Sequence, residues 1–517
     1  MRPVRTITTL ATLLAATLAL APAATAAPAS AEATSVRDVI TDPDGARHIR
    51  YDRTYGQLPV LGGDFVVHEA ADGTYEGTDR AVPGSVSVPS TTPRLSAPKA
   101  ADLATTLLRD VNPGTLLRSL KAKPQLVVDA LHGSPKLAWR TTAAAKDPLG
   151  NPTARTVLTD ATTGATIDSW NSLESATGDG RSLYSGTVPL TTTRASSGGY
   201  QLNDATRGNT YTGDAGNKTD TCVLGICLER APAKVYTDAD NHWGTGKAAD
   251  RSTAAVDAQY GTDQTWDYYK DVHGRIGIAD DGKGSYNRVH YGKDYNNAFW
   301  DDNCFCMTYG DGDGKTFGPL VALDVTGHEM SHGVTSSTAA LTYSGESGGL
   351  NEATSDIFGT LVEFHANNAS DPGDWLIGEK IVKPGADGKT SALRYMDKPS
   401  RDGKSADCWN KNVAGLDVHY SSGVANHFAY LLAEGSGPKT VGGVRNDSPT
   451  CDKSKLAGIG KEKLGKIWYR ALTVYMTSST DYKGARTATL KAAKDLYGSG
   501  GKEYAAVAAT WSAVSVN

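Results

Sequence analysis

The chain has 517 residues, of which 21% are charged and 39% hydrophobic, and its formal net charge is −5. At roughly 150 residues per domain, this length predicts three or four domains with sizeable cores. The mild acidity excludes nucleic acid as the main partner, because phosphate binding shows as a basic excess.

The N-terminus has the pattern of an export signal. Arg2 and Arg5 form a positive region, residues 7–21 are an apolar run, and residues 24–26 read Ala-Thr-Ala, a typical cleavage site. The run is too short to span a bilayer, and a signal anchor is the alternative. We therefore expect residues 1–26 to be removed and the mature protein to be secreted into the extracellular space.

Residues 27–175 combine short apolar runs with polar turns, which indicates one or two small α+β modules. The spacing predicts strands at 126–128, 155–158 and 165–167, with a hairpin turn at Thr163-Gly164, and a helix at 101–108.

The remainder of the chain changes character twice. Residues 176–320 are rich in Gly, Asp, Asn and Tyr with short strand-like runs, which predicts a β-dominated domain. Beyond residue 323 the apolar spacing becomes helical, and Gly498 is placed to end one of these helices. Three helices are predicted near the C-terminus, at 467–476, 487–497 and 504–514.

The six cysteines all lie beyond Thr221, and export permits them to form disulfides. Six cysteines allow 15 pairings, so the sequence does not decide among them. A thiolate zinc site is a weaker alternative because no CxxC pair occurs. The simplest pairing joins neighbours, Cys222 with Cys227, Cys304 with Cys306, and Cys408 with Cys451.

The sharpest motif is the H-E-x-x-H box His328-Glu329-Met330-Ser331-His332. Residues four apart lie on one face of a helix, so both imidazoles can bind one metal ion. Glu329 lies one residue further round and can reach a metal-bound water. Alone, the box also fits two surface histidines on an ordinary amphipathic helix.

A third zinc ligand is expected because a catalytic zinc takes three protein ligands and leaves one position for water. Glu352, 20 positions after His332, is that candidate. We expect Asn351 to cap the helix that carries Glu352, which would then project from its first turn. Asp356, one turn on, can accept a hydrogen bond from the far nitrogen of His328.

With these residues, the segment from about residue 295 to the C-terminus resembles the thermolysin-like neutral metalloendopeptidases, and residues from about 176 to 290 resemble them more weakly. Thermolysin is itself a known example of a zinc site built from two histidines and one glutamate. The matching stretches are 296–300 (NNAFW), 309–314 (YGDGDG), the zinc box, 352–363 (EATSDIFGTLVE) and 460–473 (GKEKLGKIWYRALT).

The resemblance implies one catalytic zinc held by His328, His332 and Glu352. Zinc would polarise a water and the scissile carbonyl, and Glu329 would take the water's proton and pass it to the leaving amine.

Two further residues are implied as donors to the oxyanion of the tetrahedral intermediate, namely Tyr343 and His419. Tyr343 would also fit an ordinary core tyrosine, and His419 an ordinary loop histidine without a catalytic role. The family has a carboxylate five residues before this histidine, whereas here that position is Ala414. Either Asp417 replaces this carboxylate or the support is missing.

The resemblance also implies substrate-binding residues. Asn297 and Ala298 match positions that bind the substrate backbone along a strand edge, and Arg394 matches an arginine that holds a substrate carbonyl. An apolar pocket for the residue after the cut is implied at Phe317, Leu320, Val325, Ile377 and Leu393, which predicts cleavage before Leu, Ile, Val or Phe.

Calcium is expected as a structural ion, with at least one bound. The carboxylates that match calcium ligands of the family are Asp324, Glu363, Asp374 and Glu379. Leu376 replaces a further ligand, which argues against a pair of ions, and Asp324 alone would also fit a helix cap.

The expected organisation is a precursor of α+β class. Residues 50–55 and 59–64 resemble the propeptide of these proteases, a segment that assists folding and inhibits the active site until cleavage near 174–177. The expected parts are a signal peptide (1–26), a propeptide (27–175, with a thermolysin-type module at about 35–85 and a PepSY-like module at about 105–172), a β-rich lobe (176–322) and a helical lobe (323–517).

We expect a monomer that acts on proteins and peptides, with no nucleic-acid or membrane partner after processing. Three other interpretations are less favoured by the residues. A metzincin needs a histidine where Thr338 stands. A related aminopeptidase would have 18 residues between His332 and its glutamate, whereas 19 are present here (333–351). An inactive binding scaffold has no physical need of Glu329.

Overall fold

A computed structural model describes residues 31–82, 84–110, 118–146, 152–171, 175–195, 198–223, 226–385 and 392–517. The expected signal peptide lies outside these residues, as does residue 174 at the expected cleavage site. Contacts divide the chain into one unit of Met1–Ala100, Pro124–Arg140 and Leu158–Asp168, and a second of Ala101–Lys123, Thr141–Val157 and Ser169–Asn517. This division does not separate the two expected lobes, so their boundary stays a prediction.

The N-terminal strands form one sheet in the order β5-β4-β2-β3-β6-β7-β8-β9, with β1 beside β2. The predicted strands at 126–128, 155–158 and 165–167 lie within or overlap β6, β8 and β9, and the predicted helix lies within α1. The bounds are β1 (Glu32–Thr41), β2 (Arg47–Tyr55), β3 (Leu58–Leu61), β4 (Phe65–Glu69), β5 (Tyr75–Arg80), α1 (Ala97–Asp110), β6 (Arg118–Asp129), β7 (Lys136–Lys146), β8 (Pro152–Asp160) and β9 (Thr166–Asn171).

The region from 175 to 309 is rich in short strands, as predicted. Its sheets run β18-β12-β11-β10-β19 and β13-β14-β20-β22-β21, with β17 beside β14. The bounds are β10 (Ser175–Arg181), β11 (Thr187–Arg194), β12 (Tyr200–Gln201), β13 (Asn203–Asp204), β14 (Thr210–Asp214), β15 (Thr221–Val223), β16 (Ile226–Glu229), β17 (Lys234–Val235), β18 (Thr237–Asp238), β19 (His242–Trp243), β20 (Tyr286–Val289), β21 (Ala298–Asp301) and β22 (Cys306–Tyr309). Among the described strands β21 has one partner, β22, and so forms an edge.

One long helix, α2 (Arg251–His273), lies in this region and was not predicted from the sequence. Nearly every residue from Thr253 to Tyr269 is buried. A helix that is covered on all sides has no polar face, and its sequence therefore lacks the alternation that reveals an amphipathic helix.

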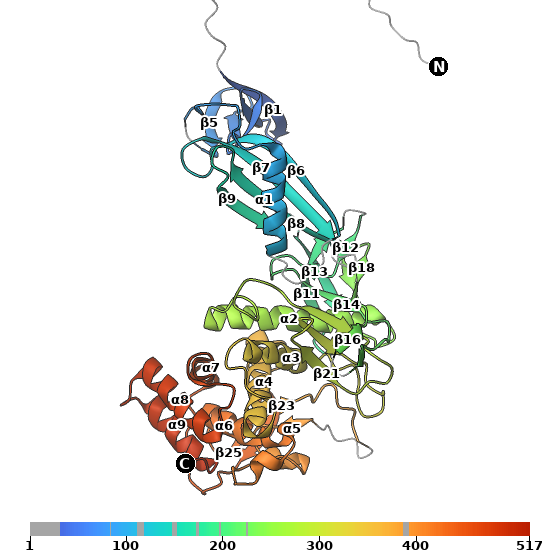
Figure 1. The fold of residues 1–517 in the computed structure, drawn as a ribbon, viewed down its shortest axis with the longest axis vertical. Coiled ribbons are helices and arrows are strands. Elements are labelled where there is room, and N and C mark those ends of the chain that lie inside the picture. The colour runs from blue at the N-terminus through green and yellow to red at the C-terminus, as the bar shows by residue number, and fades with distance from the viewer. Residues whose placement is uncertain are drawn as a thin grey trace, which may run out of the picture. The chain divides into compact units, whose positions relative to one another are not determined.

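The C-terminal part is mostly helical, and Figure 1 shows α6 to α9 gathered together at its end. The predicted helices coincide with α7 and the π-helical turn that follows it, with α8, and with α9, and Gly498 ends α8 with a φ of 81°. The bounds are α3 (Leu323–Ser336), α4 (Gly345–Ala366), β23 (Leu376–Ile377), β24 (Arg394–Tyr395), 3₁₀ turns at Pro399–Asp402 and Val413–Gly415, α5 (Val418–Ser421), α6 (Gly423–Glu434), β25 (Gly437–Val441), β26 (Val444–Ser448), α7 (Lys461–Arg470), the π-helical Ala471–Tyr475, α8 (Tyr482–Tyr497) and α9 (Lys502–Ala513).

Glycines let the central helices approach each other closely. A Cβ on Gly359 of α4 would come within 2.5 Å of the backbone oxygen of Asp324 in α3, and one on Gly261 of α2 would overlap the Thr326 side chain. Close packing of α3 against α4 brings the H-E-x-x-H box on α3 next to Glu352 on α4.

Two of the three neighbour disulfides are present, Cys304–Cys306 and Cys408–Cys451. Cys222 and Cys227 are opposite each other in the β15–β16 hairpin, but their side chains lie outside the described residues. Among the described residues, none of the helices combines the length and the apolar character needed to cross a membrane.

Candidate active site

A cleft of about 860 Å³ lies beside β21, α3 and α4. The structure brings every predicted zinc-, substrate- and oxyanion-contacting residue to this one cleft, whereas Asp356, predicted to support His328, is not among its lining residues. The predicted residues that line the cleft are Asn297, Ala298, Phe317, Leu320, Val325, His328, Glu329, His332, Tyr343, Glu352, Ile377, Leu393, Arg394 and His419.

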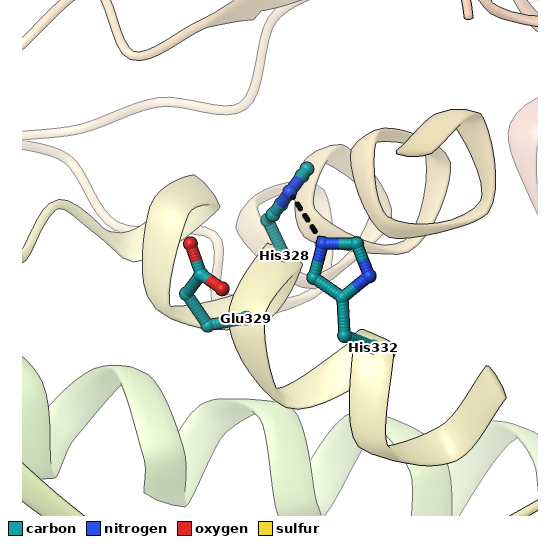
Figure 2. Close-up of side chains that lie close together, drawn as sticks. All are labelled: His328, Glu329 and His332. Atoms are coloured by element: carbon teal, nitrogen blue, oxygen red, sulfur yellow. Dashed lines mark hydrogen bonds between the residues drawn. The ribbon is translucent and has the colours of Figure 1, made fainter. Parts of the chain in front are cut away.

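His328 and His332 project from the same side of α3, one turn apart, and Figure 2 shows one nitrogen of each ring directed at the other. The two Nε2 atoms are 3.0 Å apart. Each far nitrogen has its own partner, because His328 Nδ1 lies 2.8 Å from Asp356 Oδ1 and His332 Nδ1 lies 2.7 Å from Asn351 Oδ1. When both Nδ1–H groups donate, both Nε2 lone pairs point to one place, as a metal site requires.

Glu352 places its carboxylate beside the Nε2 atoms of His328 and His332. Its oxygens lie 3.5 Å from His328 Nε2 and 3.4 Å from His332 Nε2, and its buried Oε2 has no hydrogen-bond partner. Burial alone would raise the pKa of Glu352, but the hydrogen bond from His332 and the charge of His328 hold it well below its ordinary value. Two imidazole nitrogens and an anionic oxygen are the donor set of a catalytic zinc, so these residues fit that ion.

Asn351 has a different role from the helix cap that we expected. Helix α4 begins at Gly345 after Ser344, so Asn351 and Glu352 lie beyond its first turn. The Asn351 amide donates to the backbone oxygen of Leu341 at 2.8 Å while its oxygen accepts from His332. The residue therefore orients a zinc ligand, and the cap prediction was wrong.

Asp356 is fully buried and has three partners. Arg394 donates to both of its oxygens, at 2.7 and 2.6 Å, and Asn426 donates to Oδ2 at 2.7 Å. Although burial opposes ionisation, the charge of Arg394 and the hydrogen bond from His328 lower the pKa of Asp356. A carboxylate held this firmly fixes the ring orientation and tautomer of His328.

Glu329 lies beside the two histidines on α3 (Figure 2), and one of its carboxylate oxygens lies within 4.8 Å of a ring nitrogen of each. It lines the cleft, and burial raises its pKa. A carboxylate of raised pKa next to a metal site is suited to accept and release a proton.

Tyr343 and His419 also line the cleft. The Tyr343 hydroxyl lies 3.4 Å from His419 Nε2 and donates to Glu352. His419 Nδ1 lies 2.8 Å from Asp417 Oδ1. The carboxylate that contacts this ring therefore comes from two residues before it, since Ala414 has none. Hydrogen bonds from the His419 ring and backbone lower the pKa of Asp417.

The contact between Asp417 and His419 predicts the effect of the substitution Asp417→Asn. An amide keeps the shape of the side chain but not the negative charge that lies beside His419 Nδ1. We expect kcat to fall about tenfold with little change in KM, because the loss of one charge-assisted hydrogen bond costs about 1.5 kcal/mol. Steady-state kinetics on a peptide substrate measure this, and Asp402→Asn, outside the cleft, is the control. An unchanged kcat would mean that Asp417 does not assist His419.

Models of protein families match most of the chain. Residues 177–336 match the thermolysin metallopeptidase catalytic domain, residues 339–516 its alpha-helical domain, and residues 33–78 the fungalysin/thermolysin propeptide motif. Thermolysin of Alicyclobacillus acidocaldarius subsp. acidocaldarius is 35% identical over 504 residues, covering 92% of this chain and 84% of that protein. The chain belongs to the thermolysin family of metallopeptidases.

Two further proteins are similar to this chain. A protein of Streptomyces mobaraensis named transglutaminase-activating metalloprotease is 50% identical over 485 residues, which is 94% of this chain but 61% of that protein. The solved precursor of protealysin from Serratia proteamaculans is 28% identical, with a TM-score of 0.43, and the match covers 60% of this chain and 87% of that one. Family membership confirms the predicted family, the fold class and the enzyme class, a metalloendopeptidase with a propeptide, and it implies a catalytic zinc.

A second cluster of carboxylates lies behind the thermolysin-family zinc site. Ligand atoms of Glu363, Asp371 and Glu379 all lie within 4.8 Å of one another. Glu363 and Glu379 are two of the predicted calcium ligands, whereas Asp371 was missed, although its position three residues before Asp374 in the same loop was a signal. Asp324 Oδ2 accepts from the backbone of Gly378 at 2.5 Å.

The cluster carries more negative charge than its surroundings neutralise. Burial raises the pKa of Asp324, Asp371 and Asp374 to about 6 and that of Glu379 to about 10. The ammonium of Lys380, 3.2 Å from Asp371 Oδ1, is the positive group at the site. Buried carboxylate oxygens of this kind suit a hard cation such as Ca²⁺.

Proposed function

We propose that this chain is the precursor of an extracellular zinc endopeptidase in which His328, His332 and Glu352 hold the metal. The observation that carries this proposal is the convergence of the two imidazole Nε2 atoms, 3.0 Å apart, with the Glu352 carboxylate, whose two oxygens lie 3.5 and 3.4 Å from them, in a cleft that also contains Glu329.

The proposed reaction assigns one task to each side chain. Bound zinc supplies Lewis acidity, which polarises the peptide carbonyl and acidifies a water. Glu329 takes the proton of the attacking water and delivers it to the leaving nitrogen. Tyr343 and His419 donate hydrogen bonds to the developing oxyanion from the other side of the cleft.

Substrate is proposed to lie along the free edge of β21, where Asn297 and Ala298 provide backbone and amide groups, with Arg394 holding a substrate carbonyl. The next residue of the substrate would enter the apolar part of the cleft. The side chains proposed to form this pocket are Phe317, Leu320, Val325, Ile377 and Leu393, and Ile381 lines the same cleft.

Digestion of casein by the processed enzyme tests both reaction and specificity. We expect new N-termini from the interior of the substrate, with Leu, Ile, Val or Phe at the first position. A peptide with Leu after the cut should be cleaved with a kcat/KM about fiftyfold higher than one with Ala, since three buried carbons contribute about 2.4 kcal/mol.

Mass spectrometry of the products distinguishes the alternatives. Release of single terminal residues would instead indicate an aminopeptidase, and no cleavage would indicate a binding scaffold. Cleavage before acidic residues would contradict the pocket assignment alone.

The N-terminal part is proposed to act as a removable inhibitor and folding aid. The propeptide motif at 33–78 and the start of the catalytic-domain match at 177 support cleavage near 174–177, and the enzyme itself is the proposed agent. The apolar run at 7–21 supports export of the precursor. N-terminal sequencing of the secreted protein tests this division.

One calcium ion is proposed at the carboxylate cluster. Asp324, Glu363, Asp374 and Glu379 remain the proposed ligands, to which the geometry adds Asp371. The positive charge of Lys380 already neutralises part of the cluster, which favours one calcium ion over two. The mature enzyme is proposed to be a monomer.

A further inference from the structure

Two histidines of the N-terminal sheet form a close pair. His48 in β2 and His68 in β4 are direct cross-strand partners. Their Nδ1 atoms lie 2.7 Å apart, and their side chains are 30% and 27% exposed. Cross-strand neighbours on one face of a sheet are close enough to act on one small ligand.

Each histidine has a carboxylate at its far nitrogen. His48 Nε2 lies 3.1 Å from Asp42 Oδ2, and His68 Nε2 lies 3.2 Å from Asp79 Oδ2. A carboxylate accepts hydrogen bonds only, so both Nε2 atoms carry a proton. In neutral rings the two Nδ1 lone pairs then face each other, which is unfavourable unless a cation lies between them.

The two histidines of the proposed zinc site, His328 and His332, have the same arrangement of partners. There the facing nitrogens of His328 and His332 are 3.0 Å apart, and a side-chain oxygen holds each far nitrogen at 2.8 or 2.7 Å. A zinc ion bound at about 2.05 Å in a tetrahedral arrangement would set such nitrogens about 3.4 Å apart. Small rotations of the rings supply that separation in either pair.

We propose that His48 and His68 bind one zinc ion through their Nδ1 atoms. Imidazole nitrogen is a preferred ligand of zinc. The two orienting carboxylates contribute two negative charges, which a divalent ion balances, while the adjacent Arg47 and Glu69 pair with each other. Partial exposure of the rings gives water access to the remaining coordination positions.

The ion would join β2 to β4 within the segment that matches the propeptide motif. It would therefore stabilise the precursor and have no counterpart in the chain that remains after processing. Binding to the folded state alone raises stability with ion concentration.

Zinc stoichiometry of the full-length precursor tests the proposal. The precursor carries E329Q to prevent self-digestion, and excess calcium occupies the carboxylate cluster. We expect two zinc ions per chain by equilibrium dialysis, and one in H48A or H68A. H242A is the matched control, because His242 also contacts an aspartate, Asp179 at 2.7 Å, but has no histidine partner among the described residues. It should retain two ions.

A second measurement does not depend on variants. Zinc should protect His48 and His68 of the precursor from diethyl pyrocarbonate, mapped by mass spectrometry, and should leave the reactivity of His242 unchanged. One zinc per chain in the precursor, or equal modification of both histidines with and without zinc, would show that the pair shares a proton only and would overturn the proposal.

Discussion

Replacing Glu329 with glutamine will lower kcat/KM about a thousandfold, while the variant, processed by parent enzyme that is then removed, still binds one zinc ion. Glutamine has nearly the same shape but cannot accept the proton of the attacking water, and general-base catalysis contributes roughly 10² to 10⁴ in rate. The zinc ligands are His328, His332 and Glu352 in our account, so removing the charge of Glu329 leaves the metal in place. Peptide kinetics and metal analysis of the same preparation measure the two effects.

The control for this variant is Glu462→Gln. It makes the same chemical change on α7, where the side chain is 73% exposed, and it should leave kcat/KM unchanged. If Glu329→Gln lost zinc together with activity, Glu329 would be a ligand or a structural residue. If it kept full activity, the assigned role would be wrong.

Removing calcium will lower the unfolding temperature of the mature enzyme by about 10 °C. A site filled to 1,000 times its dissociation constant contributes about 4 kcal/mol, and each kcal/mol shifts the midpoint of a large domain by about 2–4 °C. Without the cation, the buried oxygens of Glu363, Asp371 and Glu379 repel one another within 4.8 Å. Differential scanning calorimetry with calcium removed and zinc restored measures the shift.

Glu379→Gln separates calcium binding from general effects of chelation. This variant has lost one ligand and one negative charge, so its midpoint should depend less on calcium than that of the parent. The control Glu434→Gln, outside the cluster, should keep the full dependence. Equal midpoints with and without calcium in the parent would mean that the cluster holds no structural ion.

The histidine pair of the zinc site could be predicted from spacing alone, because residues four apart in a helix must share a face. Glu352 comes from another helix, and its contact with the histidines depends on how closely α3 and α4 pack. That packing depends on Gly327 and Gly359, whose importance appears only when the backbones are seen in contact. Spacing therefore offered Glu352 as a candidate third ligand, and its contact with the histidines became visible only in the folded chain.

Two features of the site could not be read from local patterns. Asn351 looks like a helix cap in sequence, but α4 begins six residues earlier, which places its amide against His332. Helix α2 has no polar face because it is buried on all sides, and periodicity identifies only half-buried helices. In both cases the decisive contacts come from tertiary packing.

The most direct test of the central claim is zinc titration of the metal-free processed enzyme. The enzyme is stripped with 1,10-phenanthroline in the presence of calcium, and zinc is added back in steps while casein hydrolysis is followed. We predict no hydrolysis in the stripped enzyme and a linear rise that ends at one zinc per chain, with no rise in a His332→Ala variant. Full hydrolysis by the stripped enzyme would contradict a zinc site at His328, His332 and Glu352 as the catalytic centre.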